Sequence, residues 1–273
     1  MRQYLDALQY ILDNGEDVAN RTGINTRAVF GMQMRYNMAD GFPAVTTKKL
    51  AFNSVKAELL WFLKGSGDVR ELQKLGSKIW DANADAPYWK PKAKFEGDLG
   101  RVYGVQWRFW QRPDGTTVDQ IAEAIRLVKQ DSDSRRIIVN AWNPGELDMM
   151  ALPPCHSFFQ LRVINNKLSL LMYQRSCDMF LGVPFNIASY SLLLHIFAHV
   201  TGLQAHEFVH ILGDAHIYHN HFDQVKEQLS RQPYALPQLG LTPNIKDIDS
   251  FTMDDIKLIG YKSHESIKAE MAV

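Results

Sequence analysis

The chain has 273 residues, of which 46% are hydrophobic, so it can bury a large core as a single domain. Its 30 lysine and arginine residues balance its 30 aspartate and glutamate residues, so no net field attracts nucleic acid or a membrane surface. Two cysteines argue against a disulfide-rich secreted scaffold and suit a reducing compartment. The first residues lack a signal peptide's apolar run, and no stretch of about 18 apolar residues predicts a membrane span. We expect a soluble cytoplasmic protein.

Hydrophobic spacing predicts the secondary structure in chain order. Apolar residues at helical spacing predict helices over 4–12, 55–63, 119–130, 187–200 and 215–231, the last with Asp214 as N-cap. Alternation predicts a half-buried strand over 28–38, with Phe30, Met32, Met34, Tyr36 and Met38 sharing one face. Further strands are expected over 137–142, and over 158–163 and 168–173 as a hairpin.

Helices and strands mix in this order without a repeating β-α rhythm. This predicts a single α+β domain over 1–273, on a large, mostly antiparallel or mixed sheet with helices packed on one face. Residues 84–96 show no clear period and are expected to form a variable loop or small excursion.

Cys155 is the candidate nucleophile, because Pro153 and Pro154 stiffen the backbone just before it. His156 is poorly placed to act as its base, since adjacent residues of a strand point to opposite faces. A nearby arginine is the more natural means of activating the thiol. The alternative is a buried structural cysteine, which is the more common role of a lone cysteine.

Arginines at three places could bind an anion such as phosphate, namely Arg21, the pair Arg135 and Arg136, and Arg175. The pair could equally be surface residues, whereas Arg175 lies in an apolar strand and would need an anionic partner if buried. Glu58 lies on the apolar helix at 55–63. Facing a cavity it would have a raised pKa and could shuttle protons, but on the surface it would have no such role.

Two groups of histidines raise the possibility of a metal site, which the spacing does not favour. The pair His195 and His199 lacks the glutamate of a zinc-protease helix, and the cluster at 216–221 has no ligand partner at a standard spacing. His216, with Tyr218 close by, is better suited to a sugar hydroxyl. Lysines at 90, 92 and 94 could contact RNA, but a solvated loop is the simpler interpretation.

Several motifs, in order along nearly the whole chain, resemble those of the thymidylate synthase family. They are Asn20-Arg21-Thr22-Gly23, Glu58-Leu59-Leu60-Trp61-Phe62-Leu63, Ile79-Trp80-Asp81, Val102-Tyr103-Gly104-Val105-Gln106-Trp107, Asp133-Ser134-Arg135-Arg136, Pro154-Cys155-His156, Tyr173-Gln174-Arg175-Ser176-Cys177-Asp178, Pro184-Phe185-Asn186-Ile187-Ala188-Ser189-Tyr190 and Gly213-Asp214-Ala215-His216-Ile217-Tyr218.

The resemblance implies reductive methylation of dUMP to dTMP, with 5,10-methylenetetrahydrofolate as carbon donor and reductant and with no metal or nicotinamide. The Cys155 thiolate would attack C6 of uracil, and the enolate at C5 would capture the one-carbon unit. Glu58 would manage protons through ordered water, while Tyr103 and His156 would help to remove the C5 proton. Loss of tetrahydrofolate would leave an exocyclic methylene that takes the hydride.

The resemblance also implies the ligands and a homodimer whose sheets pack face to face. Asn186 would read O4 and N3-H of uracil, and Arg135 and Arg136 would reach in from the second subunit. Other dUMP contacts would come from Arg21, Gln174, Arg175, Ser176, Asp178, His216 and Tyr218. The folate would be held by Lys48, Ile79, Trp80, Leu152, Asp178, Gly182, Phe185 and Val273, with the tail closing over the site.

Two rival functions remain open from the sequence. A pyrimidine-nucleotide hydroxymethylase would start identically but let water capture the exocyclic methylene; Trp80 favours water exclusion and hence methylation. A non-catalytic nucleotide- or RNA-binding relative would need no thiol, which the presence of Cys155 disfavours.

Overall fold

The computed structural model describes residues 1–20 and 22–270. The α-helices are α1 (Arg2–Asn14), α2 (Phe52–Leu63), α3 (Val69–Lys74), α4 (Asp81–Ala84), α5 (Tyr103–Arg108), α6 (Gln120–Gln130), α7 (Gly182–Thr201) and α8 (Phe222–Ser230). The strands are β1 (Glu16–Val18), β2 (Thr26–Asn37), β3 (Trp110–Gln111), β4 (Thr117–Val118), β5 (Ile138–Asn140), β6 (His156–Ile164), β7 (Lys167–Asp178), β8 (Gln204–Tyr218), β9 (Gln238–Leu241) and β10 (Ile256–Ile259).

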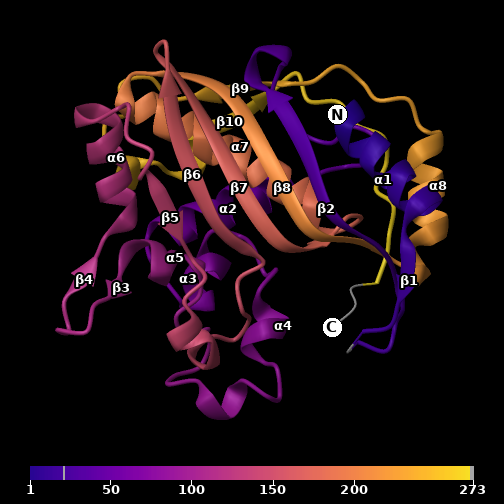
Figure 1. Cartoon of the computed structure of the whole chain (residues 1–273), viewed down its shortest axis with the longest axis horizontal. Coiled ribbons are helices and arrows are strands. Elements are labelled where there is room, and N and C mark those ends of the chain that lie inside the picture. The colour runs from indigo at the N-terminus through magenta and orange to yellow at the C-terminus, as the bar shows by residue number, and fades with distance from the viewer. Residues whose placement is uncertain (21, 271–273) are drawn as a thin grey trace.

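A six-stranded mixed sheet in the order β1-β2-β8-β7-β6-β5 organises the molecule (Figure 1). Its neighbours pair antiparallel except β7 and β8, which run parallel and are connected through α7. A parallel pair needs a crossover connection, because both of its strands must start from the same end of the sheet. The α+β class and the mixed sheet predicted from the sequence are confirmed.

Helix α7 is the central core helix, and its composition accounts for that position. It is apolar on nearly every side and packs on β7, β8 and α2. It ends at Gly202, whose φ of 72° is the left-handed conformation that glycine adopts without strain. By length and composition α7 could cross a membrane, but 83% of its most apolar 18-residue window is buried within the protein. Its apolar character is therefore explained by the core.

Two asparagines form the turn of the predicted hairpin between β6 and β7. Ile164 pairs with Lys167, which leaves Asn165 and Asn166 as a two-residue turn with φ values of 49° and 60°. Such turns match the twist of a hairpin and require positive φ at both positions, which asparagine tolerates better than other non-glycine residues. The local sequence is thus suited to this register.

The structure corrects two predictions. The segment from 215 onward is not a helix: Ala215 to Tyr218 end β8, and α8 begins only at Phe222, so Asp214 is a strand residue and not an N-cap. Pairing with both β2 and β7 outweighs the helical spacing of these side chains. Phe30 is 86% exposed and does not share the buried face of Met34 and Tyr36; the backbone leaves extended geometry directly after it, at Gly31 (φ 87°).

The excursion at 84–96 is anchored by a buried aromatic residue. Trp89 is 3% exposed and its indole N–H donates to the carbonyl of Asp98 at 2.7 Å. This contact ties the segment, which includes the short 3₁₀ turn Lys90–Lys92, to the loop that precedes α5.

The turn geometry gives a matched test at one position. Replacing Asn166 by glycine removes the side-chain penalty of a left-handed residue and should stabilise the protein by a few tenths to about 1 kcal/mol. Replacing it by valine should destabilise it by roughly 1–2 kcal/mol. Thermal unfolding at one fixed protein concentration measures both. A valine variant that is as stable as the glycine variant would contradict this description of the turn.

Candidate active site

The candidate residues meet at one end of the sheet because of its topology. His156, at the start of β6, pairs with Gln174 near the end of β7, and Asp178 at the end of β7 pairs with His216 near the end of β8. The N-terminus of α7 follows β7 directly and brings Asn186 over the same end. Site residues that are as many as 60 positions apart along the chain therefore lie at the same end of the sheet.

Arg175 holds the segment that carries Cys155. Its Nε donates to the carbonyl of Pro154 at 2.9 Å and its Nη2 to that of Pro153 at 3.0 Å, while its backbone N–H donates to the carbonyl of Cys155 at 2.8 Å. Nη2 is also 4.0 Å from Sγ of Cys155. A fixed positive charge at this distance favours the thiolate, which is the nucleophilic form.

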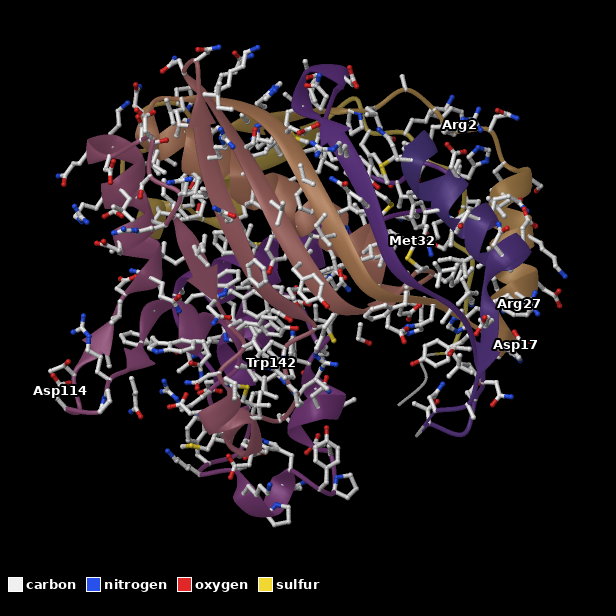
Figure 2. The ribbon with its side chains drawn as sticks, viewed as in Figure 1. Arg2, Asp17, Arg27, Met32, Asp114 and Trp142 are labelled. Atoms are coloured by element: carbon white, nitrogen blue, oxygen red, sulfur yellow. The ribbon has the colours of Figure 1, made fainter. Side chains whose placement is uncertain are left out.

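Trp142 completes the surroundings of this guanidinium group, whose carbon lies 5.1 Å from the centre of the indole ring. Figure 2 shows Trp142 at the lower end of the sheet. Such stacking suits the planar guanidinium group and restricts its motion. An arginine, Arg175, thus lies beside the thiol, as the sequence led us to expect; the use of Arg175 to bind a phosphate stays a prediction.

Tyr103 and His156 are far apart along the chain, but their rings are in contact. The Tyr103 hydroxyl accepts a hydrogen bond from the backbone N–H of Cys155 at 2.7 Å, and the two rings are 5.1 Å apart. Burial lowers the pKa of His156 to about 4, with Asn186 opposing and Arg175 adding to the shift. His156 is therefore neutral near pH 7, and burial raises the pKa of Tyr103.

Glu58 is buried within α2, at 6% exposure, and accepts a hydrogen bond from Nε1 of Trp80 at 2.6 Å. Desolvation raises the pKa of Glu58 to about 7, although the Trp80 hydrogen bond opposes the shift. Of the two roles left open by the sequence, the structure selects the inward-facing carboxyl group. A group with this pKa can both accept and donate a proton at neutral pH.

The residues predicted to contact a phosphate or sugar differ in their exposure to solvent. His216 is buried, and its Nδ1 lies 2.7 Å from Oδ1 of Asp214, a contact that orients the ring. Ser176 and Tyr218 are half-buried at the ends of β7 and β8. Arg135 and Arg136 are exposed on the loop before β5. The prediction for Arg21 lies outside the described residues.

The residues predicted to bind a folate are mostly apolar, and one of them, Trp80, is hydrogen-bonded to Glu58. Ile79 is 40% exposed, Leu152 and Phe185 are half-buried, and Trp80 is 6% exposed. Asp178 ends β7, and its Oδ1 accepts the N–H groups of Phe180 and Leu181 just before α7; Gly182, the first residue of α7, is half-buried. Exposed apolar side chains beside a carboxylate fit a flat heterocycle with N–H groups.

Lys48 is placed differently from an extended tail-binding lysine. Its ammonium group is buried, donates to the carbonyl of Phe180 and lies 3.5 Å from the centre of the Phe180 ring. Burial lowers the pKa of Lys48 to about 7, with Asp178 opposing. Its neighbour Lys49 is exposed. The predicted role of Lys48 in folate binding stays a prediction, and that of Val273 lies outside the described residues.

Sequence reasoning missed the polar residues that support the site from behind. His210, Trp142 and Tyr190 contact the site residues, and Asp214 acts through His216. Only the pair Asp214 and His216 could have been indicated by the sequence, because residues two apart on a strand point to the same face. Cross-strand and cross-helix contacts leave no local pattern.

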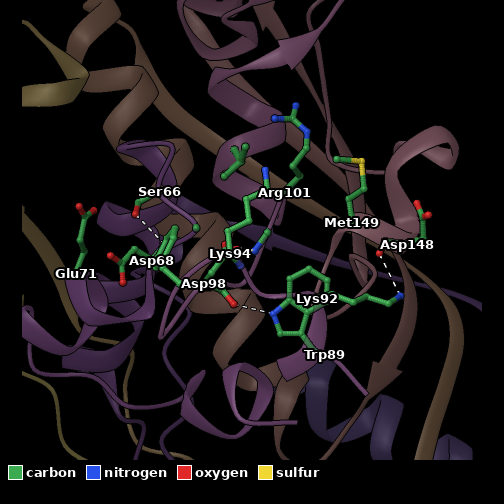
Figure 3. Close-up of a pocket in the computed structure, with 14 residues that line it drawn as sticks. Ser66, Asp68, Glu71, Trp89, Lys92, Lys94, Asp98, Arg101, Asp148 and Met149 are labelled. Atoms are coloured by element: carbon green, nitrogen blue, oxygen red, sulfur yellow. Dashed lines mark hydrogen bonds between the residues drawn. The ribbon is translucent and has the colours of Figure 1, made fainter. Parts of the chain in front are cut away.

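No group of three or more His, Cys, Asp or Glu side chains among the described residues is arranged to hold a metal ion. A cavity of about 590 Å³ lies elsewhere, between the 84–96 excursion and the start of α5 (Figure 3). Its walls carry both Lys92 and Lys94 and the acidic Glu71 and Asp148, and none of the candidate site residues lines it.

The thymidylate synthase family model matches residues 2–273, which is essentially the whole chain. The site described above occupies the positions at which the motifs of that family stand in this sequence. The chain belongs to the thymidylate synthase family, and its activity is a methylation of the kind that this family carries out.

Proposed function

We propose that the protein converts dUMP to dTMP, using 5,10-methylenetetrahydrofolate as co-substrate. The observation that carries the proposal is the Arg175–Cys155 arrangement, in which a thiol lies beside a fixed guanidinium group. The folate supplies the one-carbon unit and the hydride. The support is geometric and agrees with the family membership.

The covalent step follows from the position of Cys155. Its Sγ forms a bond to C6 of uracil, and the electron pair of the 5,6 double bond moves toward C5 and O4, which makes C5 nucleophilic. When the product leaves, the C6–Sγ bond breaks and its electron pair returns to sulfur. Arg175 stabilises the thiolate at both moments, since its charge stays 4.0 Å away.

Proton transfers are assigned to Glu58 and to the Tyr103 hydroxyl. Glu58 has a pKa of about 7 through desolvation, so it can exchange protons with the base and the folate through water. Tyr103 is held against the backbone of Cys155 and thus stays close to the carbons that react. His156 is neutral, and a side-chain hydrogen bond links it to Asn186.

The ligands follow the same assignment. Ser176, His216 and Tyr218 complete the dUMP site with Asn186 and Asp178, while Gln174 supports that site through its hydrogen bond to Asn186. Trp80, Ile79, Leu152, Gly182 and Phe185 pack on the folate. Cys155 and Cys177 are not joined in a disulfide, which a thiol mechanism requires and which supports a reducing, cytoplasmic location. Arg135 and Arg136 are exposed and are assigned to the partner's phosphate site in a homodimer.

Product analysis tests the function. With dUMP and methylenetetrahydrofolate, we expect dTMP and dihydrofolate in equal amounts, followed by chromatography and absorbance. Cys155→Ala should abolish turnover while leaving dUMP binding measurable, because the thiol is needed for chemistry and not for recognition. Hydroxymethyl-dUMP with tetrahydrofolate would identify the hydroxymethylase instead, and a Cys155→Ala variant that retains most of its activity would remove the nucleophile assignment.

Glu58 gives a pH-dependent stability prediction. Its pKa in the folded protein, about 7, lies above the unfolded value of 4.5, so the folded state binds the proton more tightly. Stability should then fall as pH rises from about 4.5 to 7, by on the order of 3 kcal/mol.

Glu58→Gln removes this pH-dependent contribution to stability. The free energy of unfolding of the variant, relative to that of wild type, should therefore rise between pH 4.5 and pH 8. Denaturant unfolding at each pH measures the difference. The same variant should lose about 10²–10⁴-fold in turnover, because a proton-transfer group is removed. A stability difference that is constant over this pH range would show that the carboxyl group is not desolvated.

Subunit mixing tests the placement of the two exposed arginines. Cys155→Ala and the double variant Arg135→Ala/Arg136→Ala should each have little activity, the second through weak dUMP binding. If the arginines serve the partner's site, a mixed dimer contains one intact site, and random mixing should restore about a quarter of wild-type activity. No recovery after subunit exchange, confirmed by mass measurement of mixed dimers, would place the arginines in their own subunit's site.

A further inference from the structure

Three buried polar side chains form a chain of hydrogen bonds behind the candidate base-reading amide. His210 on β8 and Gln174 on β7 are 0% and 2% exposed, and Asn186 on α7 is 8% exposed. Nε2 of His210 lies 2.8 Å from Oε1 of Gln174, and Nε2 of Gln174 donates to Oδ1 of Asn186 at 3.1 Å. His210 and Gln174 thus stand behind Asn186 and reach the site through it.

The polarity of this chain is set by one backbone carbonyl group. Nε2 of Gln174 also donates to the carbonyl of Ser176 at 3.0 Å, and a carbonyl can only accept. This fixes which end of the Gln174 amide is nitrogen, so Oε1 faces His210 and the imidazole must carry its proton on Nε2. Both amide hydrogens are then in use, one on Ser176 and one on Asn186. The Gln174 side chain is fully satisfied in this single orientation.

Asn186 inherits its orientation from Gln174. Turning the Asn186 amide over would place its NH₂ group against the NH₂ group of Gln174 in a buried site, which is strongly unfavourable. With Oδ1 held toward Gln174, its remaining lone pair can accept and Nδ2 can donate. That order matches N3-H and O4 of uracil, whereas cytosine presents an acceptor at N3 and a donor at its amino group.

We propose that His210 and Gln174 are positioning residues that determine the choice of uracil over cytosine, by fixing the direction of the Asn186 amide. The proposal rests on the function proposed above and deepens it. Specificity for the base then depends on a series of hydrogen bonds, here called the relay, in which the carbonyl of Ser176 orients Gln174 and Gln174 orients Asn186. His210 takes part through Nε2 alone, since its Nδ1 is buried without a hydrogen-bond partner.

Replacing Gln174 by glutamate inverts the end of the relay. In the buried, protonated form, the glutamic acid has one donor, which the carbonyl of Ser176 takes, and its oxygens otherwise accept. Residue 174 then has no donor left for Oδ1 of Asn186, so the Asn186 amide turns over and offers its NH₂ group to residue 174. The face toward the nucleotide then matches cytosine.

The readout is the ratio of the dissociation constants of dUMP and dCMP, measured by calorimetry without folate. Wild type should reject dCMP by about 10⁴-fold, as sites built on paired polar groups do. In Gln174→Glu this ratio should fall by at least about 100-fold, since two hydrogen bonds change partners. An unchanged ratio in a folded Gln174→Glu protein would overturn the proposal.

A matched control is available in Gln228, a glutamine that is 0% exposed and donates to Oγ1 of Thr47 at 3.0 Å, outside the relay. Gln228→Glu makes the same change in a buried glutamine and should keep the wild-type ratio of the two dissociation constants. A similar fall in Gln228→Glu would attribute the effect to a general loosening of the fold and would also overturn the proposal.

Variants of His210 keep the test available if Gln174→Glu does not fold. His210→Leu removes the donor to Gln174 and should lower the dUMP preference by about tenfold, the effect of one lost hydrogen bond. His210→Gln can donate from its amide and should recover most of that loss. A His210→Leu protein with wild-type selectivity, or a His210→Gln protein that recovers nothing, would count against the relay.

Failure of the relay and failure of the proposed function give different results. Wild-type protein that binds neither nucleotide, or binds dCMP better than dUMP, would refute the proposed substrate itself. Wild-type protein that prefers dUMP, together with variants that keep this preference, would leave the substrate in place and remove only the role of His210 and Gln174.

Discussion

The clamp that Arg175 forms on the two prolines before the nucleophile is the contact on which the site depends. Strand β6 starts only at His156, so Pro153 and Pro154 lie beyond the sheet ladder, and proline has no N–H with which to bond elsewhere. The guanidinium group satisfies their carbonyls and stays next to the thiol. A single side chain therefore both orders the segment and supplies the charge that favours the thiolate.

The parallel pairing of β7 and β8 determines where this clamp can act. Because the two strands run in the same direction, their last residues lie at the same end of the sheet, and the crossover helix α7 begins there as well. Thus Asp178, Asn186 and His216, far apart along the chain, meet near Cys155. A fully antiparallel arrangement of these strands would place His216 at the opposite end.

The site consists of polar groups within a dense apolar core, and their burial determines their protonation states. Desolvation raises the pKa of Glu58 to about 7 and lowers that of His156 to about 4, so the first can exchange protons and the second stays neutral. Buried polar groups of this kind are tolerated when they are hydrogen-bonded, as Gln174 is on three sides. Such groups are held in one orientation before any substrate binds.

The sequence by itself determined the local features of this protein. Two prolines stiffen the segment before Cys155, helical and alternating spacing place most helices and the hairpin, and the motifs identify the family that the whole-chain match confirms. These features depend on neighbours within a few residues, which a sequence displays directly. Most of the candidate catalytic residues were identified in this way, although their predicted roles stay proposals.

Only the tertiary structure decided the rest. It turned 215–218 into the end of a strand, because pairing with two neighbouring strands outweighs helical spacing, and it turned Glu58 inward. It also brought His210 to Gln174, a contact that depends on which strands are adjacent and in which register. Such partners are separated by many residues, and their meeting is set by the packing of the whole sheet against α7, so no local pattern can reveal it.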